Sequence, residues 1–146
     1  MWILFLDSYI KNDKKWIVDM FKKLNILFLV LIIGIIIFIF LTTHIIKIWI
    51  GEEIFIPKYL ILLWGLFALN RVYGDIYMIF INGTGKIQLQ MWLFLIGAVV
   101  NIPLSIYFIR DLNMGSSGAI LGTNICMLPL AIIMPIQAYF IIKKMK

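Results

Sequence analysis

The sequence predicts an all-α integral membrane protein with about four transmembrane helices and an N-terminal amphipathic interfacial helix. Of its 146 residues, 64% are hydrophobic and 14% are charged, whereas a soluble domain has about half apolar and a quarter charged residues. The mean hydropathy of +1.06 agrees with a membrane protein. The formal net charge of +6 then indicates contact with a bilayer of anionic headgroups, and not with nucleic acid.

Residues 1–23 are expected to form a cytoplasmic and interfacial segment. The apolar run at residues 2–6 precedes the first lysines, which is the reverse of a cleavable signal peptide and is typical of the last turns of a spanning helix. After it, apolar residues recur at helical spacing and lysines occupy the other side, and Asn12 or Asp13 can cap the start. This pattern predicts a short amphipathic helix in the headgroup region. Its apolar face consists of Trp16, Ile17, Met20, Phe21 and Leu24.

The four transmembrane helices are expected in the remaining region, 24–146, at about 24–45, 58–82, 88–109 and 118–142. The first contains a charge-free stretch at residues 24–43, about 30 Å long as a helix. Its Ile-rich centre, residues 35–39, has no polar side chains and is expected to face lipid. Pro57 opens the second helix where proline is tolerated. Gly83 and Gly85 are expected to supply the unusual backbone angles of the turn that follows this helix.

Small residues recur in the third and fourth expected helices in patterns that let transmembrane helices approach closely. They repeat every four positions in the third helix, and a Gly-xxx-Gly motif opens the fourth. Pro103 is expected to bend the third helix, and Pro129 and Pro135 the fourth. The residues expected to pack these helices are Gly97, Asn101, Gly118 and Gly122.

Arg71 and Asp75 lie in the middle of the second expected helix and are the only charges between Lys58 and Lys86. A charge at the bilayer centre costs roughly 2.5–3.5 kcal/mol on insertion scales. At about 100° per residue, one stripe of the helix contains Arg71, Asp75, Met78 and Asn82, with Gly74 beside it. This stripe is therefore expected to face the protein interior or a water-filled cavity, with the apolar face opposite turned to lipid.

The pair is open to two interpretations. In the first, Arg71 and Asp75 form an i,i+4 ion pair that neutralises itself on insertion and packs against another helix. In the second, Arg71 binds an anionic group of a substrate and Asp75 sets its position, because a guanidinium offers two parallel donors to phosphate. Lys86 is expected to enforce topology, with capture of an anionic headgroup as the alternative.

Lysine and arginine counts predict the orientation, since the cytoplasmic side carries the excess. Nine of these residues fall on one side of the expected spans and three on the other, which places both termini in the cytoplasm. The larger group is Lys11, Lys14, Lys15, Lys22, Lys23, Lys86, Lys143, Lys144 and Lys146, and the smaller is Lys47, Lys58 and Arg110.

No enzymatic site is expected, because no His/Asp/Glu cluster or nucleophile–base pair falls at one membrane face. The single cysteine, Cys126, excludes a disulfide or a cysteine-based metal site within one chain. His44 at a helix end is expected to be an interfacial residue. No cofactor is expected.

Five local patterns point to one family. The first consists of Trp2, Tyr9, Asp13, Trp16 and Ile17, followed by Phe21-Lys-Lys-Leu24. The others are the segment Ile48-Trp-Ile-Gly51 followed by Pro57, the turn Ile81-Asn-Gly-Thr-Gly-Lys86, the segment Asn101-Ile-Pro-Leu-Ser105, and the segment Gly115-Ser-Ser-Gly-Ala-Ile-Leu-Gly-Thr123. In this order they resemble the second half of bacterial polysaccharide flippases of the Wzx type. These belong to the multidrug/oligosaccharidyl-lipid/polysaccharide exporter superfamily.

The resemblance implies a protein of about twelve helices in two lobes, which moves an undecaprenyl-pyrophosphate-linked sugar unit across the bacterial inner membrane. This chain resembles the last four helices. The cavity would therefore need an N-terminal lobe or another chain. On this basis Arg71, with Asp75 and Asn82, is the expected contact to the pyrophosphate or to an anionic sugar.

Three other functions stay open. A cation-coupled drug exporter of the same superfamily needs acids within its helices, and the spans here offer only Asp75. A small four-helix transporter that oligomerises usually carries an acid in its first span, and residues 24–43 contain none. The last alternative is a non-transporting membrane protein or remnant.

Overall fold

A computed structural model of the chain describes residues 1–50, 56–57 and 59–145. Within these residues it is all-helical and contains no strand, as the sequence predicts. The third and fourth predicted spans begin and end within two residues of the observed helices. The helices are α1 (Trp2–Ile10), α2 (Lys14–Ile50), α3 (Leu60–Thr84), α4 (Gln88–Arg110) and α5 (Ser116–Lys143).

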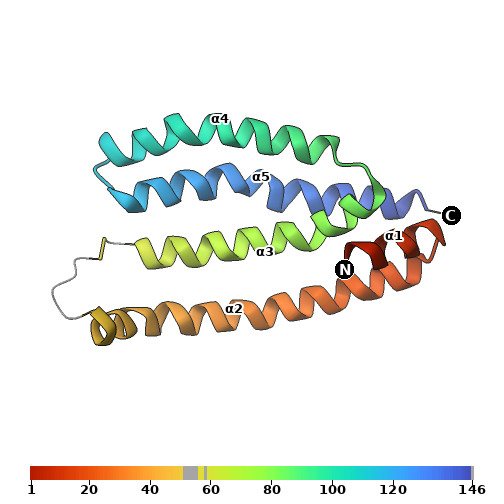
Figure 1. The fold of residues 1–146 in the computed structure, drawn as a ribbon, viewed down its shortest axis with the longest axis horizontal. Helices are drawn as coiled ribbons and strands as arrows, with labels where there is room; N and C mark the ends of the chain where they lie inside the picture. The colour runs from red at the N-terminus through yellow and green to blue at the C-terminus, as the bar shows by residue number, and fades with distance from the viewer. Residues whose placement is uncertain (51–55, 58, 146) are drawn as a thin grey trace.

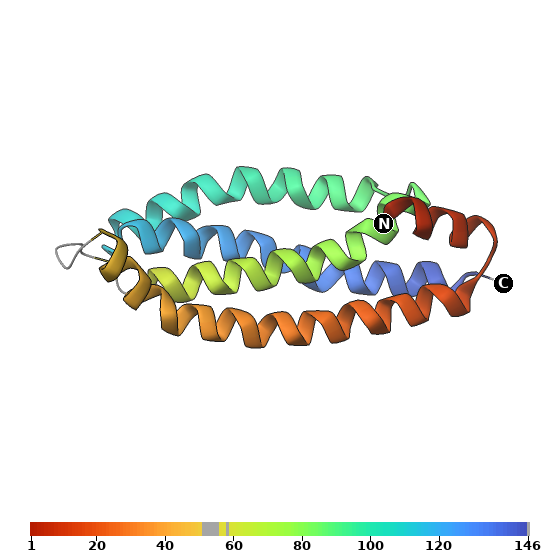
Figure 2. The same ribbon diagram turned by 60° about the horizontal axis from the view of Figure 1, so that its bottom comes forward.

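The four long helices lie side by side in the order α2, α3, α5, α4 (Figures 1 and 2). Helix α3 packs between α2 and α5, and α4 packs along α5. The short helix α1 folds back against α3 and against the beginning of α2. Helix α3 therefore contacts α1, α2 and α5, and within the described residues part of its middle stays exposed.

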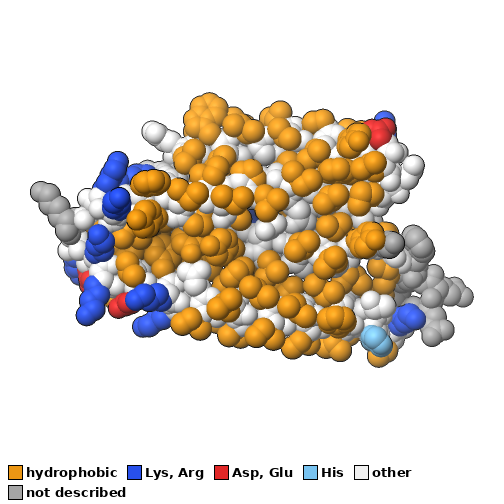
Figure 3. Space-filling view, turned by 180° about the vertical axis from the view of Figure 1, so that it is seen from behind, with side chains coloured by type: hydrophobic (Ala, Val, Ile, Leu, Met, Phe, Trp, Pro, Cys, Tyr) orange, Lys and Arg blue, Asp and Glu red, His pale blue; other side chains and the backbone are white. Residues whose placement is uncertain are grey.

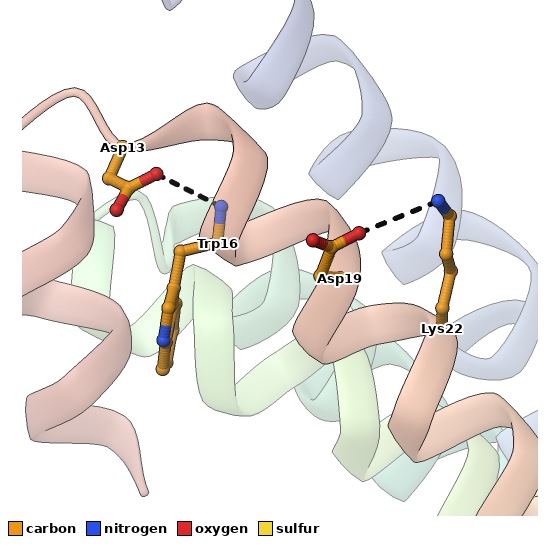
Figure 4. A network of polar contacts seen from close by, with 4 residues as sticks. All are labelled: Asp13, Trp16, Asp19 and Lys22. Carbon is orange, nitrogen blue, oxygen red and sulfur yellow. Dashed lines mark hydrogen bonds and ion pairs between the residues drawn. The ribbon is translucent and has the colours of Figure 1, made fainter.

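Helix α2 is one continuous helix of 37 residues, about 56 Å long. The sequence predicted a separate interfacial helix before residue 24, but no proline interrupts residues 14–50 and the helix runs through. Asp13 caps its start by accepting a 3.0 Å hydrogen bond from the Trp16 backbone N–H, and Asp19 pairs with Lys22 on the exposed side at 3.5 Å (Figure 4). Its predicted apolar face packs on the hydrophobic core.

An aromatic cluster joins α1, α2 and α3. The ring centroid of Phe5 lies 5.4 Å from that of Phe21 and 5.6 Å from that of Phe80. Phe5 and Phe80 are fully buried, as is Ile17 on α2. The run at residues 2–6 thus forms part of a helix that docks on this core.

The two glycines of the predicted turn have different roles. Gly85 has a φ of 74°, as expected, and follows the last residue of α3. The prediction for Gly83 was wrong, because Gly83 is helical and buried. A Cβ there would lie 3.1 Å from the Trp2 carbonyl oxygen and 3.2 Å from the Leu6 nitrogen. Gly83 therefore lets the backbone of α1 approach α3.

Helices α4 and α5 meet through small residues. A Cβ on Gly118 would lie 2.8 Å from the carbonyl carbon of Phe108, and one on Gly122 would lie 2.6 Å from Ser105 Oγ. Gly97 lies opposite the backbone of Cys126 in the same way. Asn101 Oδ1 accepts a 3.0 Å hydrogen bond from Ser105 Oγ within α4.

Within the part of the chain that the structure describes, three helices are long and apolar enough to cross a membrane, namely α2, α4 and α5. Helix α3 has 25 residues but is not among them, because Asn70, Arg71 and Asp75 lower its hydropathy. Lysine side chains gather at the end of the molecule where α2 begins and α5 ends, and the surface between the two ends is largely hydrophobic (Figure 3).

Candidate functional site

The Arg71–Asp75 pair lies near the middle of α3. Arg71 Nε donates to Asp75 Oδ2 at 3.0 Å, so the i,i+4 pair that the sequence predicted is formed. The two side chains are 44% and 39% exposed. Each therefore presents much of its surface to the space outside this bundle.

Helix α5 fixes one side of α3 next to the pair. Asn70 Nδ2 donates a 3.1 Å hydrogen bond to Asn124 Oδ1. The buried Asn124 also donates at 3.0 Å to the carbonyl oxygen of Leu63, which lies about two turns before Asn70 on α3. Gly74 lies against Ala131, where a Cβ would be 3.9 Å from the Ala131 backbone. These contacts hold α3 in one rotation relative to α5.

Helix α2 fixes the other side of α3 through aromatic residues. The Tyr77 ring stacks on Phe21 at 5.0 Å, and the Tyr73 ring lies 5.1 Å from that of Phe28. Asn25 Nδ2 donates to the Tyr77 hydroxyl at 3.1 Å. Because both flanks of α3 are occupied, Arg71 and Asp75 project between the flanks and stay partly exposed. Met78, on the same stripe, is buried in the core, so the stripe is only partly open.

The other predicted residues are less closely grouped. Asn82 is exposed on the same stripe, but it lies two turns beyond Asp75, about 10 Å along the helix. Lys86 lies beyond the end of α3, and its Nζ is 5.7 Å from the centroid of the Tyr9 ring. The structure thus brings Arg71 and Asp75 into contact, and it places Asn82 and Lys86 progressively farther toward the lysine-rich end.

An apolar groove of about 580 Å³ lies between the second half of α2 and the first half of α3. On α3 it is lined by Leu60, Trp64 and Ala68, which share the stripe of Arg71 at about 100° per residue. The sequence predicted that residues 35–39 face lipid. Ile36, Ile37 and Phe38 are exposed, and Ile35 and Ile39 are partly buried. The residues of this run that line the groove are Ile35, Phe38 and Ile39.

The groove was not anticipated from the sequence. The sequence feature that could have indicated it is the continuation of the Arg71–Asp75 stripe toward the start of α3, through Trp64 and Leu60. An apolar groove in line with an ion pair on the same helix suits an amphiphile with an apolar chain and an anionic group. Among the described residues, no three His, Cys, Asp or Glu side chains lie close enough to hold a metal ion.

Comparisons with protein-family models, with curated proteins and with solved structures found no match for this chain.

Proposed function

We propose that this chain is a four-span protein of the bacterial inner membrane and forms part of a flippase for undecaprenyl-pyrophosphate-linked oligosaccharide in polysaccharide biosynthesis. The observation that carries the proposal is the half-exposed Arg71–Asp75 pair in the middle of α3. The motifs described above supply the substrate class.

The position of the pair favours a polar pathway. A charged residue at mid-span is costly against lipid and is usually turned toward a bundle interior or a water-filled cavity. The contacts of α3 with α2 and α5 keep Arg71 and Asp75 out of the interior of this bundle. The pair therefore faces a cavity whose remaining wall another lobe or another chain provides.

The chemistry of Arg71 suits a diphosphate. The contact with Asp75 uses Nε, one of the five N–H donors of the guanidinium. The others can bind phosphate oxygens in pairs, and such charge-assisted hydrogen bonds are among the strongest available to a side chain. Asp75 holds the guanidinium on the partly open stripe, and the groove beside Trp64 offers room for an apolar chain.

The orientation follows from the charges at the two ends. Eight described lysines lie where α2 begins, where α3 meets α4 and where α5 ends. The positive-inside rule makes this end cytoplasmic. A substrate captured there would pass Lys86 and Asn82 before it reaches Arg71.

The test replaces Arg71 in a strain that makes surface polysaccharide. We expect Arg71→Ala to abolish surface polysaccharide and to cause lipid-linked oligosaccharide to accumulate in the inner leaflet, while the protein level on an immunoblot is unchanged. Val72→Ala, on the neighbouring exposed position, serves as the control.

The structural interpretation predicts a different pattern. If the pair only neutralises itself, Arg71→Ala and Asp75→Ala lower the protein level equally, and the double variant restores both the protein level and transport. That result would exclude Arg71 as a substrate contact. Normal polysaccharide in Arg71→Ala would exclude both roles.

A further inference from the structure

A second groove, of about 430 Å³, lies between the beginning of α4 and the end of α5. Two lysines border it, and hydrophobic side chains from both helices form most of its lining. The lysines are Lys86 and Lys144, and the hydrophobic residues include Leu89, Ile133, Ile136 and Phe140. The groove is separate from the Arg71–Asp75 pair, because none of its lining residues belongs to α3.

The charged end of this groove lies at the level expected for lipid headgroups. The apolar span of α4 begins at Gln88, and that of α5 ends at Lys143. Lys86 and Lys144 therefore flank the ends of two spans, at the level where headgroups lie. The residues of the lining continue from there into the expected hydrocarbon region.

We propose that this groove binds one anionic phospholipid, with the phosphate between Lys86 and Lys144 and an acyl chain along Ile133, Ile136 and Phe140. The charges select the occupant, because a zwitterionic headgroup has no net charge to complement the two lysines that border the groove. Basic pockets between transmembrane helices on the cytoplasmic side are suited to anionic headgroups for this reason.

The turn that carries Lys86 is anchored on the groove. Gln137 Nε2 donates a 2.9 Å hydrogen bond to the carbonyl oxygen of Lys86, which ties this turn to α5. Lys86 Nζ lies 5.7 Å from the centroid of the Tyr9 ring. A charge-assisted hydrogen bond to phosphate is stronger than an exposed cation–π contact, so a bound headgroup can draw the flexible side chain toward the groove.

The experiment uses the whole chain in phosphatidylcholine vesicles that contain a trace of a photoactivatable lipid. The probe is phosphatidylglycerol with a diazirine in its acyl chain, compared with phosphatidylcholine that carries the same chain. We expect phosphatidylglycerol to label the peptide around Ile133 to Phe140 about tenfold more than phosphatidylcholine. Equal labelling by the two lipids would overturn the proposal.

Two double variants distinguish binding in the groove from general attraction of anionic lipid to the lysine-rich end. Lys86→Gln with Lys144→Gln should reduce the preference to that of phosphatidylcholine. The matched control is Lys22→Gln with Lys143→Gln, which removes the same charge from the same end outside the groove and should keep the preference. An equal loss in both double variants would show only surface attraction.

Two further outcomes complete the test. Ile136→Trp fills the apolar wall and should lower labelling while leaving both lysines in place. Loss of labelling when soluble glycerol phosphate is present before irradiation would show a phosphate site without lipid selectivity and would overturn the proposal. The site requires membrane insertion but not transport, so a failed Arg71 experiment leaves it untouched.

Discussion

Asn70, which directly precedes Arg71 in α3, forms a 3.1 Å hydrogen bond with Asn124 of α5. Asn124 uses its amide group a second time to bind the Leu63 carbonyl oxygen. Two levels of α3 are thereby attached to one side chain of α5, and this sets the direction in which Arg71 leaves the helix.

The first prediction concerns this connection. Asn124→Leu keeps a similar volume but removes both hydrogen bonds to α3. Interhelical hydrogen bonds in membranes contribute about 0.6 kcal/mol on average, so we expect the free energy of unfolding to fall by about 1–2 kcal/mol. The midpoint of thermal unfolding in detergent measures this change. Ile125→Leu, on the exposed neighbouring position, should leave the midpoint unchanged. An unaltered midpoint in Asn124→Leu would mean that the connection does not stabilise the interface.

The sequence predicted the contact within the charged pair but not the interface that orients it. The spacing of Arg71 and Asp75 predicted their contact, since residues i and i+4 are neighbours on any helix. The Asn70–Asn124 bond could not be found in this way, because it joins positions far apart in the sequence. Gly83 was misjudged for the same reason: its role depends on the return of α1, which no local pattern encodes.

The predicted helix boundary near residue 24 was wrong for a different reason. Nothing between residues 14 and 50 stops a helix, so the change from a lysine-bearing stretch to an apolar one marks a change of solvent and not a break in the backbone. The two grooves also escaped prediction. Each is formed between two helices and depends on their relative rotation.

The second prediction concerns the α4–α5 contact. A Cβ added at Gly118 would lie 2.8 Å from the carbonyl carbon of Phe108 and 2.9 Å from the nitrogen of Ile109. Backbone atoms cannot rotate away, so we expect Gly118→Ala to lower the free energy of unfolding by about 1–3 kcal/mol. Thermal unfolding in detergent measures this change.

The matched control has the opposite expected sign. A Cβ at Gly34 in α2 meets nothing within 4 Å. Gly34→Ala should therefore stabilise the helix by about 0.5–1 kcal/mol through its higher helix propensity. If both alanine variants shift the midpoint in the same direction, the close approach at Gly118 is not what holds α4 on α5.

The third prediction concerns the docking of α1. Phe5 is fully buried among the rings of Trp16, Phe21 and Phe80. Phe5→Ala should cost about 3–5 kcal/mol of this local packing, so that α1 opens more often. Trypsin cleavage after Lys11, followed by mass spectrometry, reports the population of the open state.

Ile10 provides the comparison on the same helix. Its side chain is 70% exposed, so Ile10→Ala should leave the cleavage rate after Lys11 near that of the unaltered protein. Equal rates for the two variants would show that Phe5 does not anchor α1.

The fourth prediction decides whether α3 spans the membrane. Single cysteines are introduced into a Cys126→Ala background at Lys22, Gln88 and Asp111, which are all exposed. If α3 crosses, Lys22→Cys and Gln88→Cys lie on the cytoplasmic side and only Asp111→Cys reacts with an impermeant maleimide on intact cells. If α3 does not cross, the chain passes the bilayer three times, and Gln88→Cys reacts from outside while Asp111→Cys is protected. The half-exposed Arg71–Asp75 pair, at the middle of α3, lies at mid-membrane depth only in the first case. Labelling of Gln88→Cys on intact cells would therefore remove both the four-span topology and the transport pathway that depends on it.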